Sequence, residues 1–103
     1  MLFVKGRKPA DISVELKVVG FMAGEYTSII GHVPVPDECS LGGLLKKARS
    51  SGTITAALYR LLASAPAGVS VLVNGEPLPP RRRGGVRLHG GDSVSFFSAS
   101  TGG

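Results

Sequence analysis

Apolar and polar residues alternate along three stretches of the chain, and this period of two predicts half-buried β-strands. The apolar positions are Ile12, Val14, Leu16 and Val18 in the first stretch, Ile29, Gly31, Val33 and Val35 in the second, and Val69, Val71 and Val73 in the third. Because Pro34 cannot donate a hydrogen bond to a neighbouring strand, the second strand is predicted at a sheet edge. Residues 20–27, with Gly24 at their centre, are predicted to form a wide loop between the first two strands.

The spacing of apolar residues becomes helical after Ser40, which is a predicted N-cap. Four residues at the i, i+3, i+4 and i+7 positions predict one buried helix face: Leu41, Leu44, Leu45 and Ala48. A second helical stretch, capped by Thr53 and ended by Pro66 and Gly68, is predicted to turn four apolar residues inward: Ile54, Leu58, Leu61 and Leu62. The pattern is compatible with two helices or with one kinked helix.

Turn residues and prolines organise the second half of the chain. Asn74-Gly75 predicts a tight hairpin turn after the third strand. The return strand that starts at Glu76 is cut short by three prolines, and residues 81–85 are predicted to form a basic loop. A last strand carries Val94 and Phe96 on one face.

This order of elements predicts an α+β domain, with a mixed sheet of four to five strands and helices packed on one face. The first and last strands are far apart in sequence, and a β-grasp fold places them side by side and parallel at the sheet centre. The predicted core contains Val14, Leu16, Leu44, Leu58, Val71 and Phe96.

The chemistry of the chain is concentrated in its last residues. Residues 98–103 have no large apolar side chain to bury and are expected to form a flexible tail. The pair Gly102-Gly103 has no Cβ atoms, so it can enter a channel too narrow for side chains. The carboxylate of Gly103 is ionised at neutral pH and can attack the α-phosphate of ATP in another protein's site. The alternative is that the tail is an unimportant terminus.

Composition sets limits on the class of protein. The 103 residues are expected to form one domain, with residues 1–11 as a loose basic extension. A single cysteine excludes an internal disulfide, which fits a cytoplasmic location. Neither a signal peptide nor a membrane-spanning run is expected. The net charge of +5 suits an acidic protein partner or weak nucleic-acid contact, without choosing between them.

Three segments together resemble the ubiquitin-like sulfur carriers of the MoaD/ThiS family. Residues 33–45 are similar to the family's strand, turn and helix start, and residues 71–76 to its "VNG" hairpin. Residues 88–97, followed by Gly102-Gly103, are similar to its last strand and diglycine tail. The resemblance spans residues 29–103. The tail lacks the prolines frequent in MoaD-type members, whereas the long two-part helical region favours MoaD over ThiS.

The resemblance implies that the chain is a carrier, acted on by an enzyme rather than being one. A ubiquitin-activating-type adenylyltransferase would use ATP to adenylate Gly103, and a sulfur donor would convert it to a thiocarboxylate. The acceptor would be MoaE-like, giving molybdopterin, or thiazole-synthase-like, giving the thiamine thiazole. Cysteine synthesis, tRNA thiolation and lysine conjugation are further family alternatives. The chain itself would bind no cofactor.

Residues outside the tail offer weaker candidates. Cys39 lacks a neighbouring base at a recognisable spacing, so a structural role is expected. His32 and His89 lack the close spacing of metal ligands, and no metal site is expected.

Partner binding is predicted for residues in and near the tail. Phe97 lies on the face opposite the core residues, where it either joins a second small cluster or anchors a partner. Three consecutive arginines, Arg81, Arg82 and Arg83, could form a solvated loop or dock an acidic partner. They lack interleaved aromatic residues, which disfavours nucleic acid. Ser100 and Thr101 are predicted to contact the partner together with the tail.

Two classes of function follow. In the first, the protein is a sulfur or acyl carrier with a reactive terminus, most similar to MoaD. In the second, it is a ubiquitin-like binding module that docks partners through its sheet, and the diglycine has no chemical role.

Overall fold

The computed structural model describes residues 11–22, 24–64 and 68–98. Within them, five strands form one sheet in the order β2-β1-β5-β3-β4. Their bounds are Ile12–Met22 (β1), Glu25–Val35 (β2), Val69–Val73 (β3), Glu76–Pro77 (β4) and Ser93–Ser98 (β5). The central pair, β1 and β5, is parallel, and the other neighbours are antiparallel. This mixed sheet confirms the predicted β-grasp arrangement.

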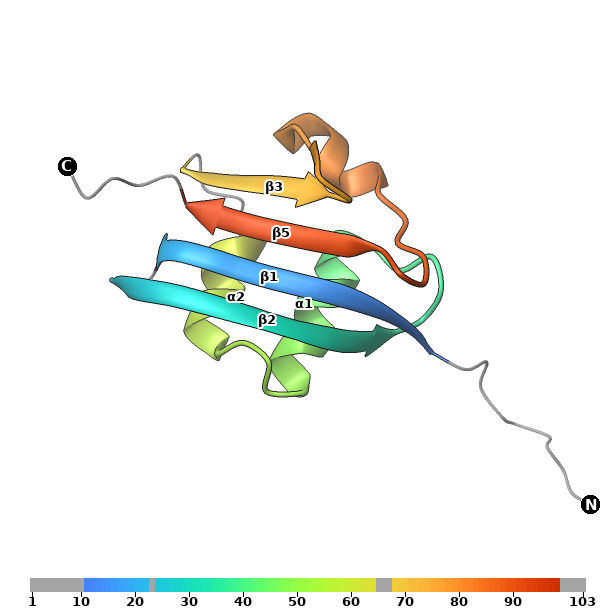
Figure 1. The fold of residues 1–103 in the computed structure, drawn as a ribbon, viewed down its shortest axis with the longest axis horizontal. Coiled ribbons are helices and arrows are strands. Elements are labelled where there is room, and N and C mark those ends of the chain that lie inside the picture. Colours follow the sequence, from blue (N-terminus) through green and yellow to red (C-terminus); the bar gives the residue numbers. More distant parts are fainter. Residues whose placement is uncertain (1–10, 23, 65–67, 99–103) are drawn as a thin grey trace, which may run out of the picture.

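Two helices cover one face of the sheet and lie behind it in Figure 1. They are α1 (Leu41–Ser50) and α2 (Ala56–Ala63), and the opposite sheet face is turned toward the viewer. Side chains from the helices and from the covered face form one cluster. All six predicted core residues belong to it: Val14, Leu16, Leu44, Leu58, Val71 and Phe96.

The wide loop predicted at residues 20–27 is wrong. β1 and β2 pair continuously from Ile12↔Val35 to Met22↔Glu25, so the hairpin connection is tight. Phe21, Tyr26 and Thr27 favour extended structure, and their side chains sit well on a pleated surface. The predicted loop treated Gly20 as the end of the strand, whereas Gly20 lies inside β1 with φ +125°. The edge position predicted for the second strand is confirmed.

Side-chain caps fix where both helices begin. Ser40 accepts a hydrogen bond from the Gly43 amide at 3.0 Å and caps α1, as predicted. The predicted Thr53 cap of the second helix is wrong, because Thr55 accepts from the Leu58 amide at 3.1 Å. Ile54 is still buried, but it belongs to the turn that separates the helices. The region therefore contains two helices.

The β3–β4 hairpin turns at Asn74-Gly75, with φ 53° and 83°. These values match the type I′ turn that the dipeptide predicts. The side-chain amide of Asn74 donates a hydrogen bond to a carboxylate oxygen of Asp92 at 3.0 Å and accepts one from the backbone N–H of Ser93 at 2.9 Å. These two bonds join the turn to the start of β5. The following basic segment is a 3₁₀ helix, η1 (Pro80–Gly85), instead of the predicted loop. A proline at its start suits the first turn of a helix.

Leu44 tests the core assignment, because its side chain is fully buried. We expect Leu44→Ala to lower the free energy of unfolding by about 2–5 kcal/mol, through lost burial and the cavity left behind. Denaturant unfolding measures the change. Lys47→Ala, at an exposed position of the same helix, is the control and should stay within about 0.5 kcal/mol. Equal effects of the two substitutions would contradict the packing described.

Candidate functional site

The candidate site is the end of β5, from which the predicted reactive tail continues. β5 is paired on both sides up to this end, with Val19 of β1 and Ser70 of β3 opposite Phe97. Val69 of β3 is opposite Ser98. The predicted tail residues, Ser100, Thr101, Gly102 and Gly103, lie outside the described residues. The sheet therefore sets the position and direction from which the tail starts.

Phe97 lies on the uncovered face of the sheet, as its place in the alternation predicts. Its side chain is 38% exposed. It borders a hollow of about 350 Å³ whose wall includes Lys17, Val19 and Leu72. A half-exposed aromatic beside a concave surface can anchor a partner by burying apolar area.

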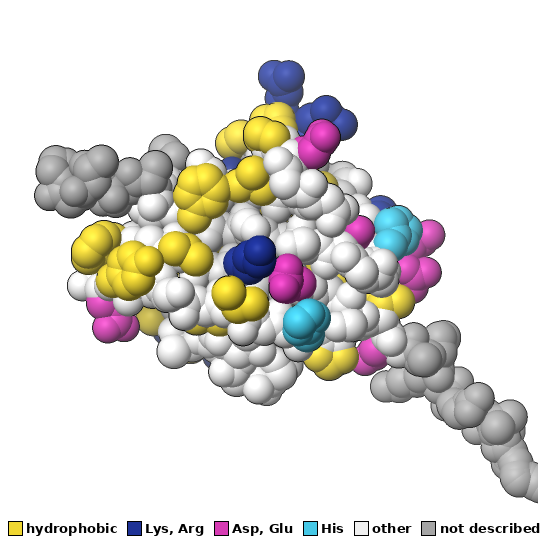
Figure 2. Space-filling model, viewed as in Figure 1, with side chains coloured by type: hydrophobic (Ala, Val, Ile, Leu, Met, Phe, Trp, Pro, Cys, Tyr) yellow, Lys and Arg dark blue, Asp and Glu magenta, His cyan; other side chains and the backbone are white. Residues whose placement is uncertain are grey.

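Apolar side chains continue from Phe97 across β1 and β2. Three of them are more exposed than Phe97: Phe21 at 54%, Tyr26 at 60% and Ile30 at 66%. Phe21 and Tyr26 are opposite each other in the hairpin, and their rings meet edge to face with centroids 5.5 Å apart. We call Val19, Phe21, Tyr26, Ile30 and Phe97 the apolar sheet patch. Figure 2 shows hydrophobic side chains gathered on this face.

Sequence reasoning missed all but Phe97 of this patch. The cause is the loop wrongly expected at residues 20–27, which concealed that Phe21 and Tyr26 are cross-strand partners. The available signal was the continued alternation of Val19 and Phe21 on one strand and Tyr26 and Ile30 on the other.

The other end of the same face is polar. Glu15 accepts a hydrogen bond from the Ser93 hydroxyl at 3.0 Å, and it lies 3.8 Å from the Lys17 ammonium. His32 is opposite Glu15 in the β1–β2 ladder and is exposed. Apolar residues are therefore concentrated at the end of the sheet where β5 ends.

The three arginines of η1 differ in their surroundings. The Arg83 guanidinium donates to the carbonyls of Val69 at 3.4 Å and Leu78 at 3.5 Å, so it holds η1 against β3. Arg81 and Arg82 are exposed and line a separate hollow of about 510 Å³, near Val73 at the far end of β3. The structure does not place them in the same hollow as Phe97.

Cys39 is half-buried, and its backbone bridges to Leu88 on the loop before β5. Its Sγ is 3.3 Å from the Ser40 carbonyl, and burial raises the pKa of the thiol. A raised pKa lowers the fraction of reactive thiolate at neutral pH. This environment agrees with a structural cysteine.

The two histidines lie apart from each other. His89 Nδ1 is 3.3 Å from an Asp37 carboxylate oxygen, and both side chains are exposed, whereas His32 is on β2. Among the described residues, no three His, Cys, Asp or Glu side chains are grouped to hold a metal ion.

Comparisons with known proteins point to one family. The model of the ThiS family matches residues 23–103. The solution structure of the Haloferax volcanii HVO 2177 protein is similar, with 23% sequence identity, a TM-score of 0.44, and coverage of 98% of this chain and 99% of that chain. No curated protein shows a significant match. The family model supports the ThiS-like alternative better than the MoaD-like one predicted from the sequence. No helix in the described ranges is long and apolar enough to cross a membrane.

Gly20 tests how the end of β5 is held. A Cβ added at Gly20 would lie 2.7 Å from the Ser98 carbonyl oxygen. The backbone φ of Gly20 is +125°, a conformation that would strain any residue with a side chain. We expect Gly20→Ala to destabilise the fold by about 1–3 kcal/mol in denaturant unfolding. The control is Gly24→Ala, which also has a positive φ but meets no atom within 4 Å. If the two substitutions cost the same, close approach to Ser98 has no part in the effect.

Proposed function

The chain belongs to the ThiS family, and from this premise we propose that it is a sulfur carrier whose Gly103 carboxylate is the reacting group. The observation that carries the proposal is the extent of the family match. It runs to residue 103 and so includes Gly102 and Gly103 together with the whole of β5. The lack of a Cβ at both positions suits a narrow active-site channel.

In the first step, a carboxylate oxygen of Gly103 attacks the α-phosphorus of ATP in a ubiquitin-activating-type enzyme. The bond to pyrophosphate breaks, and pyrophosphate leaves with its electron pair. In the second step, a hydrosulfide donor attacks the acyl carbon of the adenylate, AMP leaves, and the thiocarboxylate remains. The partner enzyme supplies the ATP site, and the chain supplies the acyl group.

We propose a thiazole-synthase-like enzyme as the sulfur acceptor, because the matched family model is that of ThiS. A MoaE-like subunit is the second candidate, favoured by the two separate helices between β2 and β3. Presenting the thiocarboxylate form to each acceptor separates the two pathways.

Docking of the activating enzyme is proposed to use the apolar sheet patch. The patch lies at the end of the sheet where β5 leads into the tail, so an enzyme that takes up the tail also faces Phe97. Arg81 and Arg82 would reach the same partner from the neighbouring edge, since interfaces commonly cover about 800 Å² on each protein. Ser100 and Thr101 would enter with the tail.

Phe97→Ala tests the docking surface. We expect the dissociation constant for the activating enzyme to rise by roughly 30-fold, typical of an interface anchor. The midpoint of thermal unfolding should change little, because Phe97 is exposed on the face that the helices do not cover. Ser95→Ala, on the same face of β5, is the matched control for binding. A large loss of stability with unchanged binding would show that Phe97 serves the fold instead.

Removal of Gly102 and Gly103 tests the tail. After incubation with the cognate activating enzyme, ATP and a sulfur donor, intact mass spectrometry should show one oxygen replaced by sulfur in the full chain only. The shortened chain should still bind the enzyme through the apolar sheet patch, because that surface is unchanged. The sulfur-carrier proposal fails if the full chain stays unmodified while the shortened chain performs the same cellular task. That outcome favours the binding module.

A further inference from the structure

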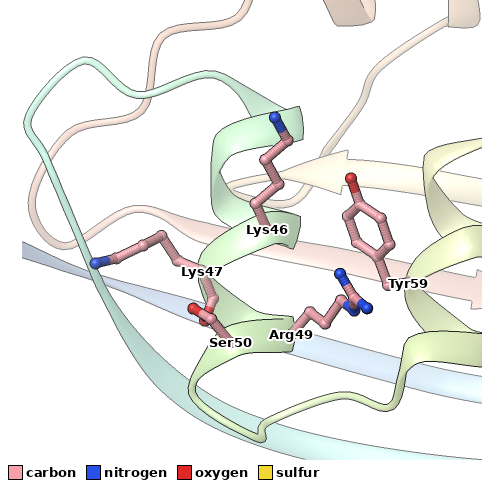
Figure 3. Close-up of a pocket in the computed structure, with 5 residues that line it drawn as sticks. All are labelled: Lys46, Lys47, Arg49, Ser50 and Tyr59. Carbon is pink, nitrogen blue, oxygen red and sulfur yellow. The ribbon is translucent and has the colours of Figure 1, made fainter.

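The helix layer carries a basic hollow on the other side of the sheet from the apolar sheet patch. Five residues of α1 and α2 line this hollow of about 550 Å³: Lys46, Lys47, Arg49, Ser50 and Tyr59. Figure 3 shows Lys46, Arg49 and Tyr59 around the space between the two helices. The Lys47 side chain is directed away from it.

The charge around the hollow has one sign. Between residues 39 and 75 the sequence contains no Asp or Glu and four cations: Lys46, Lys47, Arg49 and Arg60. In the part of the chain that the structure describes, ion pairs are formed by Glu15 with Lys17 and by Asp37 with His89. None of the described carboxylates neutralises the cations of the hollow. An anion that enters it would meet an uncompensated positive field.

Arg49 is held in place by the aromatic ring beside it. Its guanidinium carbon lies 5.5 Å from the centroid of the Tyr59 ring, a cation–π arrangement. Among the described residues, none accepts a hydrogen bond from the Arg49 guanidinium, so its N–H groups stay available. Those groups match the two oxygens of a carboxylate. Because the ring already restrains Arg49, less side-chain freedom is lost when an anion binds.

We infer that this hollow binds a carboxylate side chain from an acidic segment of a partner protein. Arg49 would form the paired hydrogen bonds, and Lys46 would add a second charge across the hollow. The Tyr59 ring and the methylene stems of Lys46 and Arg49 provide apolar walls for the residues that flank the carboxylate. Nucleic acid is disfavoured, because Arg49 covers the Tyr59 ring, the aromatic surface of this hollow on which a base would stack.

The inference does not rest on the sulfur-carrier function, since it concerns neither the tail nor the apolar sheet patch. It is tested by NMR titration of the full-length ¹⁵N-labelled protein with a capped peptide of alternating Glu and Ala. The same peptide with Gln in place of Glu, and an oligothymidylate of equal charge, are the comparison probes. We expect the Glu peptide alone to give saturable shifts centred on Lys46, Arg49 and Tyr59.

Four variants distinguish a specific binding site from a diffuse positive field. Arg49→Gln and Lys46→Gln should each raise the dissociation constant for the Glu peptide at least about fivefold. Arg60→Gln removes the same charge from an exposed position of α2 outside the lining of the hollow, and it should change the dissociation constant less than about twofold. Arg49→Lys, which keeps the charge but loses the planar donors, should behave like Arg49→Gln. Unchanged amide spectra away from the hollow confirm that the variants fold.

Each contrary result overturns the inference in a different way. Equal losses from Lys46→Gln and Arg60→Gln would mean that only the net charge attracts the peptide. Binding of the Gln peptide at the same residues would exclude carboxylate recognition. Tighter binding of the oligothymidylate at these residues would identify a nucleic-acid surface instead.

Discussion

The pairing of β5 with β1 on one side and β3 on the other is the interaction on which the rest of the structure depends. In the part of the chain that the structure describes, β1 otherwise pairs with β2 and β3 otherwise pairs with β4, so β5 is the strand that joins the two hairpins. An isolated hairpin is marginally stable in water. β5 also supplies Val94 and Phe96 to the core, beside Leu16 and Val18 of β1. The strand that leads to the tail proposed to react is therefore the strand that completes the fold.

This pairing also determines what surrounds the start of the tail. β5 pairs with residues 15–19 of β1, whereas β1 continues to Met22 and pairs with β2 over its whole length. The β1–β2 hairpin thus extends past the end of β5, and it carries Phe21 and Tyr26 on its uncovered face. Because β5 is parallel to β1, the chain at Ser98 runs in the direction of this overhanging hairpin. An activating enzyme that takes up the tail, as proposed, would meet exposed aromatic rings at the same place.

Much of the fold could be predicted, because its sequence signals are local and agree with one another. The alternation of apolar and polar residues predicted three strands, and helical spacing predicted the buried face of α1. The dipeptide Asn74-Gly75 predicted the turn between β3 and β4. The errors occurred where two local signals competed. Glycine at position 20 suggested a loop although the strand continued, and Thr53 and Thr55 were both acceptable caps. The inward role of Arg83 depends on carbonyls of β3 and of the segment after β4, so the basic run alone could not reveal it.

The two sides of the molecule can recognise partners independently of each other. Binding at the apolar sheet patch, as proposed, would remove apolar area from water, which depends little on salt. Binding at the basic hollow, as inferred, would act through charge, whose reach in solution is about 8 Å at physiological ionic strength. The hollow lies in the helix layer and the patch on the sheet face that the helices do not cover, so the two surfaces do not share a binding area. One partner could therefore hold the helix layer without changing how tightly another binds at Phe97.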